Sequence, residues 1–144
     1  LSLDKKTLMM IHKPFRLGCP CNRFVCTLTS KSGEVIGRIL QRFTSIKAVY
    51  DVINGKGEKL FTFRSRQYDH RICDVCCCFK VALMPFDVID RNNRKVGEIT
   101  QKWKAGASFA GPKNFHVVFP ANETINVKCL LMAGAFMIKS LHFD

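Results

Sequence analysis

The chain has 144 residues, a mass of 16.4 kDa and 47% hydrophobic residues. This is the length of one domain, with enough apolar material for a core, so composition excludes a disordered tail and a multi-span membrane protein. Lysine and arginine number 23 against 11 acidic residues, which gives a formal net charge of +12 at pH 7 and a pI near 9.6. Such a surplus favours an anionic partner, either nucleic acid or an acidic membrane surface.

The chain begins at Leu1 and shows no basic segment followed by an apolar stretch and a small-residue cleavage site. We therefore expect a protein that is not secreted and whose N-terminal part is missing here. The eight cysteines are clustered, with Cys76–Cys78 contiguous and Cys19 and Cys21 one residue apart. Adjacent cysteines rarely satisfy disulfide geometry with each other, so the pattern predicts free thiols in a reducing compartment.

Short apolar and β-branched runs dominate the chain up to Pro120. Three turn signals separate them, at Lys31–Gly33, Asn54–Gly57 and Arg91–Arg94. Asn-Gly and related pairs supply the positive φ values of tight hairpins, and many short strands indicate a sandwich or barrel. The expected strands are Thr7–Ile11, Arg23–Thr29, Val35–Phe43, Ala48–Ile53, Lys59–Arg64, Phe79–Leu83, Asp87–Asp90, Val96–Trp103 and Phe115–Phe119.

An internal repeat is visible at an offset of 60 residues, where VIGRILQRF at 35–43 matches KVGEITQKW at 95–103. Each copy follows a turn and, further upstream, a cysteine cluster. A weaker match downstream pairs Val52–Ile53 with Val118–Phe119 at an offset of 66. The repeat predicts two similar β-meanders in one sheet or barrel, with the two cysteine clusters in roughly equivalent places.

The last segment lacks strand alternation and is rich in Leu, Met and Ala, which favour helix, with Asn122 or Thr124 as the N-cap. Its unbroken apolar run, Cys129–Ile138, has ten residues, whereas a membrane-spanning helix needs roughly 20. Length therefore favours burial inside the protein, with membrane insertion as the alternative. The predicted organisation is a single domain over 1–144, with the repeat at about 19–63 and 76–120 and a hydrophobic helix at 122–143.

Several of these stretches together resemble the C-terminal half of the phospholipid scramblase family. They are residues 96–103, the N-F-H-V-V-F-P of 114–120, Val127-Lys128 and the apolar tail ending Leu141–Asp144. Cys19-Pro20-Cys21 resembles the family's first cysteine-rich segment, and Cys73, Cys76 and Cys78 resemble its second. The resemblance implies a mainly β, tubby-like fold. This is a closed antiparallel β-barrel around a central hydrophobic C-terminal α-helix, which missing N-terminal strands would leave incomplete.

The clustered thiols have three interpretations. The resemblance implies S-palmitoylation at Cys19, Cys21, Cys76, Cys77 and Cys78, because several acyl chains anchor stably where a single chain binds only marginally. The second interpretation is that free cysteines are simply small buried hydrophobes. The third is a Zn or Fe–S site built from His70, Cys73, Cys76, Cys19 and Cys21. C-x-C paired with C-x2-C is not a standard zinc-finger spacing, so we rank metal third.

The resemblance also raises calcium, because the scramblase family carries an acidic segment before and through its N-F…F-P element. In residues 110–123 of this chain, Gly, Lys and Asn occupy the acidic positions. Glu123 is the remaining carboxylate, and Lys113 opposes a cation. Ca²⁺ takes six to eight oxygen ligands, usually including several carboxylates, so we predict that this segment binds no Ca²⁺.

Basic residues cluster at expected turns and strand ends. The residues predicted to bind an anionic surface are Arg64, Arg66, Arg71, Arg91, Arg94, Lys95, Lys102 and Lys104. An anionic phospholipid membrane is the favoured partner, and the resemblance to tubby-like proteins implies phosphoinositide or phosphatidylserine headgroups. Nucleic acid is disfavoured because few aromatics interleave these charges for base stacking. Two further interpretations are charge that only keeps the protein soluble and charge that contacts protein partners.

The chain contains no G-x-S-x-G, H-E-x-x-H, P-loop or paired-carboxylate motif, so we predict no catalytic residues and no enzyme. The leading hypothesis is a scramblase-family protein at the cytosolic face of a plasma or organelle membrane. It would move phospholipids between leaflets in both directions without ATP, or bind membrane lipid. The competing hypotheses are a non-transporting membrane or phosphoinositide-binding adaptor and a structural docking subunit of a larger assembly.

Overall fold

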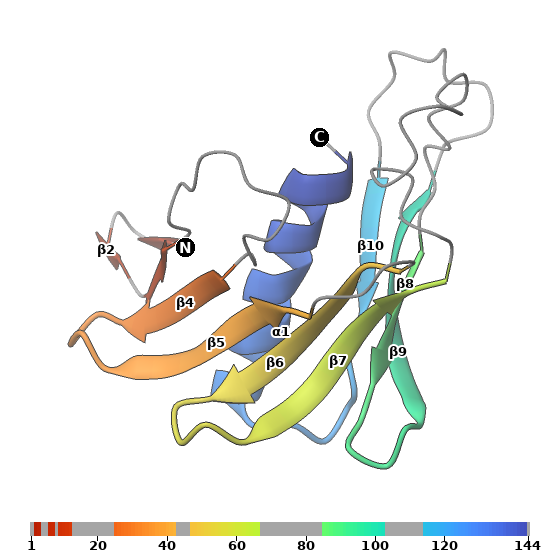
Figure 1. Cartoon of the computed structure of the whole chain (residues 1–144). Helices are drawn as coiled ribbons and strands as arrows, with labels where there is room; N and C mark the ends of the chain where they lie inside the picture. The colour runs from red at the N-terminus through yellow and green to blue at the C-terminus, as the bar shows by residue number, and fades with distance from the viewer. Residues whose placement is uncertain are drawn as a thin grey trace.

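The structure is a computed structural model that describes residues 2–3, 6–7, 9–12, 25–42, 47–66, 85–102 and 114–143. Its main feature is an eight-stranded antiparallel sheet in which each strand lies beside its neighbour in sequence (Figure 1). The strands of this sheet are β3 (Met9–His12), β4 (Val25–Ser30), β5 (Val35–Gln41), β6 (Val49–Asn54), β7 (Lys59–Ser65), β8 (Phe86–Ile89), β9 (Lys95–Lys102) and β10 (Asn114–Val118). A separate two-stranded ladder joins β1 (Ser2–Leu3) to β2 (Lys6–Thr7).

Three hairpins of the sheet, β4–β5, β6–β7 and β8–β9, share one turn geometry. In each, the backbone N–H of the first turn residue donates to the carbonyl oxygen of the residue four positions later, at 2.8–2.9 Å. The donors are Ser30, Asn54 and Asp90. The fourth residue of each turn has positive φ, and it is Gly33, Gly57 or Asn93. Glycine and asparagine are the residues that tolerate this left-handed conformation. The three predicted turns are therefore the tight turns of the sheet.

The second strand of each of these hairpins contains one extra residue. Gly37 pairs with Leu28 and Val35 pairs with Thr29, which leaves Ile36 without a cross-strand partner. Leu60 and Val96 occupy the same position in the other two hairpins. All three are aliphatic and pack against the core. Such bulges bend a strand and increase its twist, so three at one end of the sheet help it to curve.

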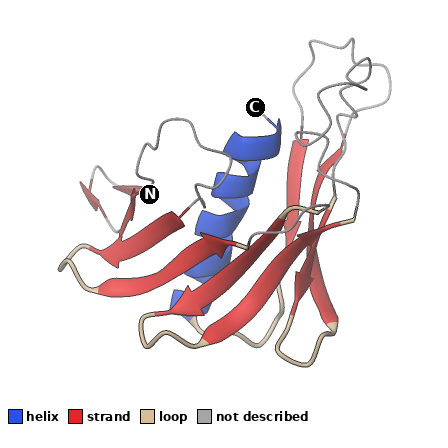
Figure 2. Cartoon of the chain, in the orientation of Figure 1, coloured by secondary structure: helices blue, strands red, loops and turns tan. Residues whose placement is uncertain are grey.

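Helix α1 (Ile125–Ile138) lies in the hollow of the curved sheet and continues into a π-helical turn, η2 (Lys139–Phe143) (Figure 2). Thr124 is its N-cap, since the Thr124 side chain accepts a hydrogen bond from the Val127 N–H. The buried helix residues are Leu130, Leu131, Ala133, Gly134, Ala135, Met137 and Ile138. Burial is not complete, because Phe136 is 45% exposed and Ile125 is 79% exposed.

Glycines allow α1 to approach the sheet closely. A Cβ atom at Gly37 on β5 would overlap the side chain of Leu130, and one at Gly134 on α1 would overlap the ring of Phe63 on β7. Leu130 and Phe63 therefore fill space that a larger residue at Gly37 or Gly134 would occupy. The helix is seated against β4, β5 and β6.

The prediction of a mainly β fold with a hydrophobic C-terminal helix is confirmed. The sheet is not closed into a barrel, because β3 and β10 form its two edges and do not pair with each other within the described residues. This arrangement is consistent with an incomplete barrel. The predicted strand Thr7–Ile11 is divided between β2 and β3, and the predicted strand Phe79–Leu83 lies outside the described residues.

The hairpins β4–β5 and β8–β9 have the same register at an offset of 60 residues. Cys26 pairs with Ile39 as Phe86 pairs with Ile99, and the extra residue falls at the same place in both. The next strands are offset by 65 residues, one fewer than the sequence match suggests. The reason is that Val52 pairs with Ile39 where Val117 pairs with Ile99.

The two ends of the sheet differ. Three tight turns lie at one end (Figure 1), and α1 begins there, as the contact of Leu130 with Gly37 near the first turn indicates. The strand ends that border residues 13–24, 43–46, 67–84 and 103–113 lie at the other end. We call these the turn end and the connection end.

Candidate functional site

The structure describes five of the eight cations predicted to bind an anionic surface, namely Arg64, Arg66, Arg91, Arg94 and Lys95. For Lys102 it describes the backbone but not the side chain. The predicted residues outside the described part of the chain are Arg71, Lys104, Cys19, Cys21, His70, Cys73, Cys76, Cys77 and Cys78. The lipidation and metal hypotheses therefore stay predictions. Among the residues that are described, no group of three or more His, Cys, Asp and Glu could hold a metal ion.

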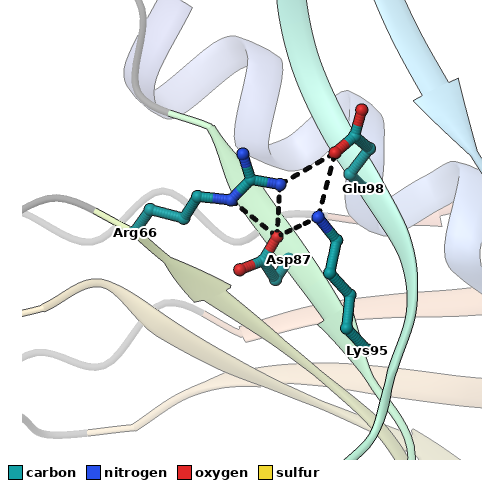
Figure 3. A network of polar contacts seen from close by, with 4 residues as sticks. All are labelled: Arg66, Asp87, Lys95 and Glu98. Carbon is teal, nitrogen blue, oxygen red and sulfur yellow. Dashed lines mark hydrogen bonds and ion pairs between the residues drawn. The ribbon is translucent and has the colours of Figure 1, made fainter.

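Arg66 and Lys95 belong to a cluster of four alternating charges with Asp87 and Glu98 (Figure 3). Arg66 Nη2 lies 2.6 Å from Asp87 Oδ1 and 2.8 Å from Glu98 Oε2. Lys95 Nζ lies 3.0 Å from Asp87 Oδ1 and 3.1 Å from Glu98 Oε2. Both cations thus contact the same two oxygen atoms. We call these four residues the ionic ring.

Strand register explains why the ring forms. Asp87 and Glu98 are direct partners across β8 and β9, on the face of the sheet opposite the buried side chains of Phe86 and Ile99. We call this the outer face. Two like charges directly opposite each other destabilise a strand pair. Arg66, which follows β7, and Lys95, at the start of β9, offset this repulsion by bridging the two carboxylates.

The ring shifts the pKa of each member. Partial burial raises the pKa of Asp87, but hydrogen bonds from Arg66 and Lys95 outweigh it and hold the pKa below its ordinary value. Hydrogen bonds from Arg66 and Lys95 lower the pKa of Glu98. Hydrogen bonds to Asp87 and then Glu98 raise the pKa of both Arg66 and Lys95. All four groups are therefore charged at neutral pH, and the ring has no net charge.

The predicted cations at the third turn are also paired. Arg94 lies 3.1 Å from Asp90, and Arg91 lies 3.6 Å from Glu58 in the neighbouring hairpin. The backbone N–H of Arg94 is the largest influence that lowers the pKa of Asp90. Arg64 differs, because within the described residues it forms no ion pair although Asp87 is its cross-strand neighbour. Among the predicted cations whose side chains the structure describes, Arg64 is therefore the one without an ion pair.

The prediction grouped the cations with one another and did not include their carboxylate partners Asp87 and Glu98. A signal for them exists, because both lie close to the predicted turn at Arg91–Arg94. A hairpin there brings residues 87 and 98 opposite each other once one extra residue is allowed in the second strand. Arg66 could not be placed in this way, since 67–84 separates it from β8 in sequence.

The fold and this surface define a β protein built on one main sheet, with a buried C-terminal helix and a strongly basic composition. A family model described as Scramblase matches residues 2–144. The chain belongs to the Scramblase family. No helix formed by the described residues is both long and apolar enough to cross a membrane.

Individual relatives are distant. The chain is 24% identical to phospholipid scramblase 4 of Homo sapiens over 147 residues, and 22% identical to its Mus musculus counterpart over 145 residues. It is 20% identical over 145 residues to phospholipid scramblase family member 5 of Homo sapiens. Each alignment covers 96% of this chain but only 42%, 42% and 51% of the respective relative. The chain therefore spans about half the length of these relatives. No solved structure matches it.

Proposed function

We propose that this chain is part of a protein that binds anionic phospholipid at the cytosolic face of a membrane and moves phospholipids between leaflets without ATP. The family match over residues 2–144 is the observation that carries the proposal. The net charge of +12 supports an anionic surface as the partner. We propose no enzymatic activity and no calcium site at 110–123, and we rank packing and lipidation of the clustered thiols above a Zn or Fe–S site.

The topology supports an orientation in which the connection end faces the membrane. Cys19 and Cys21 lie in the connection 13–24, and Cys76–Cys78 lie in the connection 67–84. The antiparallel order of the strands puts the residues that flank both connections at the same end of the sheet. Acyl chains on either cluster would thus tether the same end, and two attached chains hold a protein at a bilayer far better than one.

Cations on the outer face would add an electrostatic contribution. Each lysine or arginine near an anionic bilayer contributes about 1 kcal/mol of binding free energy. This attraction decays over about 8–10 Å at physiological salt, so only cations close to the surface count. Arg64 is the first candidate because it is not held by a carboxylate within the described residues.

A non-transporting lipid-binding adaptor is the second candidate, and one observation favours it. Leu130, Leu131 and Ile138 are buried against the sheet, so much of the apolar surface of α1 is already used inside the protein. A buried helix of 14 residues offers lipids no path across a bilayer. A docking subunit of a larger assembly would share this feature and would instead co-purify with a stoichiometric protein partner.

A lipid-flip assay on the full-length protein separates these functions. The protein is reconstituted into liposomes that contain a fluorescent phospholipid, and a membrane-impermeant reductant reports the label in the outer leaflet. We expect the protected inner-leaflet fraction to become accessible, with heat-inactivated protein as the control. Binding to the liposomes without flip would support the adaptor, and neither binding nor flip would contradict both. Glu123→Ala should not change the result with or without Ca²⁺. Elemental analysis should find no stoichiometric zinc or iron.

A further inference from the structure

We propose that the ionic ring inhibits binding of the outer face to anionic lipid. Asp87 and Glu98 act as internal substitutes for lipid phosphate or carboxylate groups and occupy Arg66 and Lys95. This inference rests on the proposed function, because it assumes that cations of this face meet anionic phospholipid. Under this proposal Arg66 and Lys95, two of the predicted anion-binding residues, bind lipid only after Asp87 and Glu98 release them.

The geometry places the ring where a lipid surface could reach it. The side chains of Arg66 and Lys95 are 39% and 48% exposed, so neither is sealed from solvent. Asp87 and Glu98 are less exposed and lie between the two cations (Figure 3). A headgroup that approaches this face therefore meets cations whose Arg66 Nε and Nη2 and Lys95 Nζ groups already contact protein oxygens.

Competition is the physical basis of the inhibition. Guanidinium binds carboxylate and phosphate with the same forked geometry, so a headgroup competes with Asp87 and Glu98 for the Nε and Nη2 edge of Arg66. Displacement would leave the two carboxylates opposite each other across β8 and β9 and facing an anionic membrane. Repulsion between them adds to the cost of exchange. The ring thus favours the unbound state as long as both carboxylates are charged.

The alternative is a purely structural role, in which the ring braces β7, β8 and β9. The backbone N–H of Arg66 already donates to the carbonyl of Pro85 at 3.0 Å, so the strands are joined there without the ring. A brace predicts that removal of the carboxylates weakens the fold and leaves lipid affinity unchanged except for the altered net charge. Inhibition predicts a gain in affinity beyond the net-charge effect.

A matched pair of double variants separates these roles. Asp87→Asn with Glu98→Gln removes two negative charges and releases Arg66 and Lys95. Glu34→Gln with Glu123→Gln removes the same charge from residues that form no ion pair within the described part of the chain. Each full-length variant is titrated with vesicles of phosphatidylcholine with and without phosphatidylserine, and bound protein is measured by flotation. Thermal unfolding checks that both are folded.

We expect the ring variant to bind phosphatidylserine vesicles more tightly than the control variant, by about five-fold for each cation released. Adding Arg66→Gln and Lys95→Gln to the ring variant should abolish this gain. Equal binding of the ring and control variants, while the unmodified protein binds, would overturn this inference alone. If neither the unmodified protein nor any variant binds, the proposed function fails as well. Should the ring variant not fold, Glu98→Gln against Glu34→Gln makes the same comparison.

Discussion

The hairpins β4–β5 and β8–β9 have one backbone design and two different outer faces. Both have the same register, an extra residue at the same position and the same pattern of turn hydrogen bonds. On the inner face both contribute buried apolar residues, such as Ile39 and Ile99. On the outer face the positions of Asp87 and Glu98 are taken by Thr27 and Arg38 in the first hairpin. Turn and core residues therefore preserve the shape, whereas the outer face is where the two copies differ in charge.

The inner face also differs in one respect, which is contact with the helix. Gly37 in the first hairpin leaves room for Leu130 of α1. Its equivalent Gly97 faces the backbone carbonyl of Val118 on β10. Gly37 likewise faces the backbone carbonyl of Ile53 on β6, so both glycines admit the next strand and Gly37 admits a helix side chain as well. Substitution of Gly37 should therefore disturb α1, whereas substitution of Gly97 should disturb β10 alone.

The largest effects should come from the equivalent core positions. Ile39→Ala and Ile99→Ala should each lower the free energy of unfolding by about 2–5 kcal/mol, because both side chains are fully buried and truncation leaves a cavity. Ile39 also lies beside Gly134 of α1, so Ile39→Ala should reduce hydrogen-exchange protection of the helix more than Ile99→Ala does. Urea unfolding and hydrogen exchange test this prediction. Equal hydrogen-exchange protection of α1 in both variants would contradict the packing of Ile39 against the helix.

Glycine substitutions should follow. Gly37→Ala should cost about 1–3 kcal/mol, because the new methyl group meets Leu130 and the carbonyl of Ile53 and forces both to move. Gly97→Ala should also destabilise the protein but leave α1 in place, since its close contact is with β10. The measurement is urea unfolding with hydrogen exchange of α1. Loss of hydrogen-exchange protection of α1 in Gly97→Ala would contradict the claim that Gly97 contacts β10 and not the helix.

The turns should give a smaller and asymmetric effect. Gly33 has φ +86° and no neighbouring atom near its missing side chain, so Gly33→Ala tests backbone conformation alone. It should cost about 1–2 kcal/mol, the penalty of an L-residue in the left-handed region. Asn93→Gly should change stability by less than about 0.5 kcal/mol, because reduced strain offsets the flexibility of glycine in the unfolded chain. Thermal unfolding of the pair measures the difference.

The smallest effect should be a difference in acid sensitivity. Asp87 and Glu98 have folded pKa values below their ordinary values of 3.8 and 4.5. A lowered folded pKa contributes stability that is present above the unfolded pKa and is lost as pH falls through the folded pKa. The β8–β9 hairpin should therefore lose stability progressively as pH falls from the ordinary pKa values of the two carboxyl groups through their lowered folded values. The slope of unfolding free energy against pH in that range should be shallower in Asp87→Asn/Glu98→Gln, and an unchanged slope would argue against the ring.

Local chemistry made much of the fold predictable. Asn-Gly and the Arg-Asn-Asn-Arg stretch marked two of the turns, and the ten-residue apolar run was too short for a membrane span and is largely buried. Register was harder, because Ile36, Leu60 and Val96 shift the pairing by one residue without any break in the apolar pattern.

The ionic ring was beyond sequence reasoning for a related reason. Its members come from β8, β9 and the residue after β7, so it depends on strand order as well as on register. Arg66 and Lys95 were identified as cations, but whether a cation is free or paired follows from the tertiary structure. Arg64, two residues before Arg66, illustrates this, since it has the same charge and no ion pair within the described residues.

Flotation of the unmodified full-length protein with vesicles is the most direct test of electrostatic binding to an anionic membrane. Vesicles of phosphatidylcholine alone are compared with vesicles that also contain phosphatidylserine, from low to high salt. We predict binding that rises with the phosphatidylserine content and falls as salt screens the cations. Equal binding to both vesicle types, or binding that salt does not weaken, would contradict a role for the basic surface in membrane recognition.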